Sequence, residues 1–84
     1  MDRRAKIAEV NPDAILWDNL DEAIIGIDVD NVAVYDIYKM ELEIMKLQDC
    51  SFEEAVEWVD YNILSAYVGE WTPKHIYLIP EDEK

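Results

Sequence analysis

The chain has 84 residues, and 20 acidic residues against seven lysines and arginines give it a formal net charge of −13. This length predicts one domain with a small core, and a hydrophobic content of 51% excludes the composition of a disordered protein. The charge excludes direct binding to nucleic acid or anionic lipid, because both would repel such a surface.

No apolar run approaches the roughly 20 residues that span a membrane. The N-terminus has no apolar stretch of the secretory kind, and the single cysteine, Cys50, has no partner for an internal disulfide. We therefore expect a cytoplasmic protein.

Along the chain, residues 1–13 are predicted to be an N-terminal arm, residues 14–80 a single α+β domain and residues 81–84 an acidic tail. Short apolar runs predict strands over residues 14–17, 23–27 and 32–35. Gly26 interrupts the second run, which indicates that another group approaches the backbone closely there. The sequence DVDN at residues 28–31 is typical of a turn, so the last two of these strands are expected to form an antiparallel hairpin.

Two helices are predicted to follow. Asp36 can cap a helix over residues 37–48, and Ser51 with Glu54 forms the capping-box pattern of the next helix, for which Gly69 is a plausible end. That helix has the clearest apolar periodicity of the chain, at Phe52, Ala55, Val56, Val59, Ile63, Ala66 and Tyr67. With a last strand at residues 75–79, we predict a small antiparallel sheet in the order β-β-β-α-α-β, with two helices packed on one face.

The second helix carries the strongest functional signal. Six acids and no base lie between Lys46 and Lys74. On a helical wheel Tyr61 lies opposite the core, with Glu54 and Trp58 on one side of it. Aromatic side chains among carboxylates suit a protein contact surface. The predicted contact residues are Trp58 and Tyr61 as anchors and Glu53, Glu54, Glu57, Asp60, Asp28 and Asp30 as substitutes for phosphates. The alternative is that Trp58 folds back against a loop, such as the one that holds Trp71.

The first helix has two apolar stripes where packing on a sheet requires one. Tyr38, Leu42 and Met45 form the second stripe, which either the N-terminal arm or a second copy of the chain would cover. These three residues are therefore the predicted seam of a possible homodimer.

The sequence contains no motif that is typical of a particular enzymatic reaction. The D-x-D pair at Asp28 and Asp30 lacks the glycine and the distal acid of an EF-hand loop. Cys50 and His75 would form a nucleophile–base pair only if the fold brought them together. We predict a protein that is not an enzyme and has no catalytic residue, metal or cofactor.

Three segments, at residues 21–27, 32–36 and 53–73, carry the pattern DEAIIGI, VAVYD and EEAVEWVDYNILSAYVGEWTP. This pattern resembles a family of small, mostly uncharacterised acidic proteins of bacteriophages and prophages. The resemblance implies a phage context and no active site.

Charge, size and this resemblance together predict a non-catalytic acidic protein-binding module of a phage type. Its partner would be a basic host protein with a nucleic-acid-binding site, such as a defence or repair enzyme, and neither nucleic acid itself nor a membrane. The alternative is a small structural or regulatory homo-oligomer that does not mimic nucleic acid.

Overall fold

The computed structural model describes residues 2–80 and confirms the α+β class. The predicted acidic tail, residues 81–84, lies outside the described residues. In chain order the elements are helix α1 (Arg3–Val10), the 3-10 turn η1 (Asp21–Ala23), strands β1 (Ile24–Ile27) and β2 (Ala33–Asp36), helices α2 (Ile37–Gln48) and α3 (Phe52–Val59), the π-helical turn η2 (Asp60–Leu64) and strand β3 (Lys74–Ile76).

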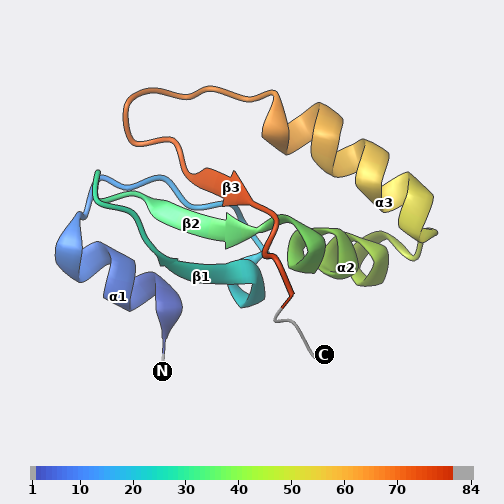
Figure 1. Cartoon of the computed structure of the whole chain (residues 1–84), viewed down its shortest axis with the longest axis horizontal. Helices are drawn as coiled ribbons and strands as arrows, with labels where there is room; N and C mark the ends of the chain where they lie inside the picture. Colours follow the sequence, from blue (N-terminus) through green and yellow to red (C-terminus); the bar gives the residue numbers. More distant parts are fainter. Residues whose placement is uncertain (1, 81–84) are drawn as a thin grey trace.

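The three strands form one sheet in the order β1-β2-β3 (Figure 1). The predicted hairpin is confirmed, since β1 and β2 pair antiparallel across the turn at residues 28–31. The prediction of a wholly antiparallel sheet is wrong, because β3 pairs parallel to β2. Parallel neighbours need a long crossover, and here α2, α3 and the segment after them carry the chain back to the starting end of β2.

Residues 14–17, predicted to be the first strand, form no ladder. The amide of Ile15 donates to the carbonyl of Trp71 at 3.2 Å, and the amide of Trp17 donates to the hydroxyl of Tyr35 at 2.9 Å. These single bonds hold an extended segment whose Leu16 and Trp17 pack against the core. The apolar run is explained by this packing, which needs half-buried side chains but no strand partner.

The surroundings of Gly26 also differ from the prediction that another group approaches its backbone. A Cβ atom at this position would meet nothing within 4 Å, so no group approaches the backbone closely. The pairing of β1 with β2 is irregular between Ile24 and Gly26, and a glycine in a strand is common at such a bulge.

The two central helices begin as predicted. The Asp36 side chain accepts the amides of Tyr38 and Lys39. Ser51 and Glu54 form a complete capping box, with bonds of 3.1 and 3.0 Å. Both caps are local, so they depend on sequence neighbours alone.

The second helix does not run on to Gly69. After Val59 it widens into the π-helical turn η2, where the Asn62 amide donates to the Trp58 carbonyl and the Ser65 hydroxyl donates to the Tyr61 carbonyl. Side chains that bond to backbone carbonyls compete with the helical ladder and favour such an irregular end. Tyr67 was predicted to be a core residue, but it lies beyond this end and is 78% exposed.

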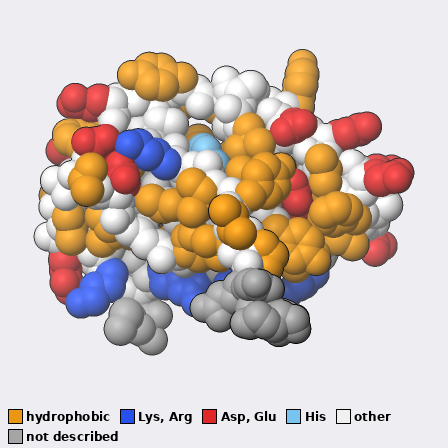
Figure 2. Space-filling view, viewed as in Figure 1, with side chains coloured by type: hydrophobic (Ala, Val, Ile, Leu, Met, Phe, Trp, Pro, Cys, Tyr) orange, Lys and Arg blue, Asp and Glu red, His pale blue; other side chains and the backbone are white. Residues whose placement is uncertain are grey.

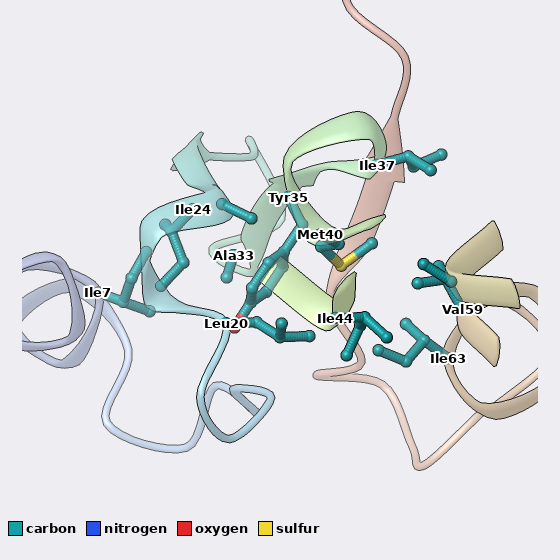
Figure 3. Packing of buried hydrophobic residues seen from close by; sticks show 12 residues of the cluster. Ile7, Leu20, Ile24, Ala33, Tyr35, Ile37, Met40, Ile44, Val59 and Ile63 are labelled. Carbon is teal, nitrogen blue, oxygen red and sulfur yellow. The ribbon is translucent and has the colours of Figure 1, made fainter. Parts of the chain in front are cut away.

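One core joins all the helices (Figure 3). It extends from Ile7 of α1 past Tyr35 of β2 to Ile44 of α2 and Val59 of α3. Residues 1–13 were predicted to be an arm, yet Ile7 is only 2% exposed, so α1 is part of the packed body. Helix α2 follows directly from the end of β2, and α3 packs along α2 more than on the strands (Figure 1). The predicted pair of helices on one sheet face is therefore a helix pair joined to the sheet mainly through α2.

Candidate protein-binding face

The acidic face consists of Glu53, Glu54, Glu57, Asp60 and Tyr61, on α3 and η2. All five residues are exposed. Figure 2 shows one group of acidic side chains at the right-hand end of the molecule, over α3, and another at the left-hand end, where basic side chains lie beside it. Within residues 2–80, none of these four carboxylates takes part in an ion pair. The negative charge of this face is therefore left uncompensated by the described part of the chain.

Seven acids elsewhere in residues 2–80 are ion-paired. Arg4 binds Asp21 at 2.7 Å, Lys46 lies 3.3 Å from Glu43, and Lys74 binds both acids of the β1–β2 turn. Within residues 2–80 the ion-paired bases thus lie on acids of other segments, and none of them offsets the negative charge of the α3 carboxylates.

A shallow depression of about 740 Å³ gives the acidic face a concave part. Its lining residues are Glu54, Glu57, Trp58, Asp60, Tyr61, Asn62 and Ser65. Tyr61 is 83% exposed, as the helical wheel predicted, and stands among the carboxylates with its ring available for contact.

Trp58, the other predicted anchor, is half-buried and packs against the core. It also lines a second depression together with Trp17 and Leu47. The indole therefore folds back toward α2 and residues 17–20. Only part of Trp58 remains for a partner, so Tyr61 is the main exposed aromatic group of the face.

Asp28 and Asp30 do not join the acidic face. They lie on the turn between β1 and β2, at the opposite end of the molecule from α3 (Figure 1). The Lys74 ammonium donates to both carboxylates, at 2.8 Å to Asp30, and its hydrogen bond lowers the pKa of Asp28. The same two acids raise the pKa of Lys74. Between residues 2 and 80 there is also no cluster of three or more metal-ligating side chains.

The three residues of the predicted dimer seam have different neighbours in the fold. Tyr38 contacts Phe52 edge to face, with ring centroids 5.9 Å apart, and Met45 packs against the core. Leu42 lines a separate depression beside Arg3. The start of α3 covers part of the second stripe at Tyr38, and Arg3 of the N-terminal helix lies beside Leu42, so the three residues do not form one continuous free surface.

Cys50 and His75 have different neighbours. The thiol of Cys50 donates to the carbonyl of Ile44 at 3.9 Å. His75 accepts the indole N–H of Trp17 through Nε2 at 2.9 Å, and burial lowers the pKa of its imidazole. The hydrogen-bonded cluster of Trp17, Tyr35 and His75 was missed from the sequence, because its members come from three distant segments with no shared period.

Comparison with family models, with curated proteins and with solved structures finds no match to this chain. The resemblance to small phage proteins therefore stays a prediction. Across residues 2–80, no helix has both the length and the apolar character needed to cross a membrane.

Proposed function

We propose that this protein is a non-catalytic, acidic protein-binding module of a phage type. It presents its acidic face to a basic, nucleic-acid-binding site of a larger host protein, such as a defence or repair enzyme in the cytoplasm. The observation that carries the proposal is the set of four carboxylates on α3 and η2 that no base in the described chain neutralises, with the exposed ring of Tyr61 among them.

In such a complex Glu53, Glu54, Glu57 and Asp60 take the places of phosphates. Like charges on one face repel each other, and a basic partner relieves that repulsion. Charge of this kind accelerates encounter and selects the partner more than it adds affinity. Tyr61 supplies rigid buried area at low entropic cost.

Asp28 and Asp30 have no direct part in this contact. Lys74 neutralises them, and they lie at the other end of the molecule. Trp58 contributes only the edge that the depression exposes.

The test is capture from a bacterial lysate at about 0.05 M and about 0.5 M salt, because exposed charges are screened over about 8–10 Å at ordinary ionic strength. We expect a basic nucleic-acid-binding protein to be retained at low salt only, and duplex DNA or RNA to displace it. Capture that is insensitive to salt and to nucleic acid would refute the mimicry.

Two triple variants with the same change in charge make the test specific. Glu54→Gln, Glu57→Gln and Asp60→Asn together should abolish capture, and glutamine can retain the capping box of α3. The matched control replaces acids that are ion-paired, Glu9→Gln, Asp18→Asn and Glu22→Gln, and should retain capture. If both variants lose capture equally, the binding depends on the net charge of the protein and not on the acidic face.

A second candidate is a homo-oligomer, and the observation that favours it lies outside the predicted seam. The sheet carries exposed apolar residues, with Ile25, Ile27 and Ile76 each between 36% and 40% exposed. A second copy would bury them. Light scattering should then show a dimer that Ile76→Lys dissociates, whereas a monomer at all concentrations would exclude this function.

A further inference from the structure

A groove on another side of the molecule separates α2, the start of α3 and the residues that follow β3. Its volume is about 480 Å³, and Glu41 and Asp36 lie along it with aromatic and aliphatic residues. The remaining lining residues are Tyr38, Phe52, Val56, Tyr77, Leu78 and Pro80. We call it the Glu41 groove. It shares no lining residue with the depression of the acidic face.

Glu41 is the unusual residue of this groove. It is only 3% exposed, and within residues 2–80 it has no hydrogen-bond or ion-pair partner. Asp36, the other buried acid, is occupied by the cap of α2. Among the described residues, every side-chain polar atom that is fully shielded from solvent has a hydrogen-bond partner. Because the carboxylate of Glu41 has no such partner, it must retain a small contact with solvent, and it lines the groove. A buried carboxylate without a partner is costly.

The charged groups near Glu41 increase that cost. Burial raises its pKa, and the nearby carboxylates of Asp60 and Asp36 raise it further. The positive charge of a cation in the groove would offset both the cost of desolvating the carboxylate and the repulsion from its acidic neighbours.

The walls of the groove suit an organic cation. Tyr38 and Phe52 meet edge to face, and Tyr38, Phe52 and Tyr77 are 53%, 39% and 63% exposed, so their rings are open to an incoming group. Aromatic faces attract cations, and aliphatic neighbours pack against an alkyl chain.

We propose that the Glu41 groove binds a lysine side chain of a partner protein, with the ammonium on the Glu41 carboxylate and the alkyl stem along the aromatic and aliphatic walls. Lysine fits better than arginine, because its compact head needs one acceptor whereas a guanidinium fork is best matched by a freely presented carboxylate edge. This site shares no lining residue with the depression of the acidic face, although the charge of Asp60 acts on Glu41, and it can be occupied when that face has no partner.

The probe for the test is lysine blocked as its acetyl amide, and the matched neutral control is norleucine blocked in the same way. The readout is the carboxyl carbon resonance of Glu41 in the full chain, followed by NMR as each compound is added. The lysine compound should shift this resonance in a saturable manner and lower the pKa of Glu41, and the norleucine compound should do neither.

Three variants locate the site. Glu41→Gln preserves shape, and we expect it to weaken lysine binding by at least about tenfold, followed through the amide resonances of α2. Tyr38→Leu keeps an apolar wall without the aromatic face, and we expect a loss of about two- to fivefold. Glu57→Gln removes the same charge from the acidic face and should leave the affinity unchanged.

Equal binding of the norleucine compound, or full affinity in Glu41→Gln, would overturn the proposal. The terminal residue Lys84 lies outside the described residues and supplies the remaining control. If Lys84→Gln alone moves the Glu41 resonance, the chain fills its own groove and the site is not one for a partner; an unmoved resonance supports the proposal.

Discussion

The hydroxyl of Tyr35 provides a sharp test of the core. This side chain is 0% exposed, and its oxygen accepts the amide of Trp17 at 2.9 Å. Tyr35→Phe keeps the ring and removes the acceptor, which leaves a half-buried amide without a partner. Such a loss costs about 1–2 kcal/mol in the free energy of unfolding. For a domain of this size, each kcal/mol lowers Tm by about 4–8 °C.

Chemical and thermal unfolding followed by tryptophan fluorescence and circular dichroism would measure this cost. The control is Tyr67→Phe, at a side chain that is 78% exposed and should tolerate the change. The amide of Trp17 should also exchange with solvent faster in Tyr35→Phe. A variant that matches the natural chain in both stability and exchange would refute the reasoning, because the segment at residues 14–17 would then not depend on this bond.

Three further predictions concern local groups. Burial lowers the pKa of His75 below its ordinary 6.5, so the unfolded chain binds the proton more readily than the folded chain. The free energy of unfolding should therefore decrease as pH falls from about 6.5 toward the folded pKa. A His75→Gln variant with the same dependence on pH would contradict this. Lys74→Gln should return the pKa of Asp28 toward 3.8, measured by carboxyl NMR, and an unchanged low value would show that the ammonium is not its cause. Ser51→Ala should lower the free energy of unfolding by about 1 kcal/mol through the lost cap of α3, and urea unfolding at unchanged midpoint would exclude that role.

Features that depend on neighbours in sequence were predicted well. The turn at residues 28–31, the cap at Asp36 and the capping box at Ser51 all form as expected. The exposure of Tyr61 followed from helical period alone. In each case a few adjacent residues supply both the bonding groups and the geometry.

Features that depend on distant segments were not predicted. The parallel pairing of β3, the packing of Ile7 and the pairing of Lys74 with Asp28 all join residues far apart in the chain. A strand was predicted at residues 14–17 because a short apolar run has the same sequence pattern in a strand as in an extended segment that packs against the core.

The order of residues alone determined the unbalanced charge of the segment before Lys74, the helix beginnings and the hairpin, since these arise from composition and from groups within one turn of each other. Only the folded chain decided which acids keep their charge unopposed. Lys74 reaches Asp28 and Asp30 across the sheet, whereas no described base reaches the carboxylates of α3, and the crossing of α2 by α3 buries Glu41 beside a groove. The physical reason is that a carboxylate responds to whatever lies within a few ångströms in space, and that neighbourhood is set by packing.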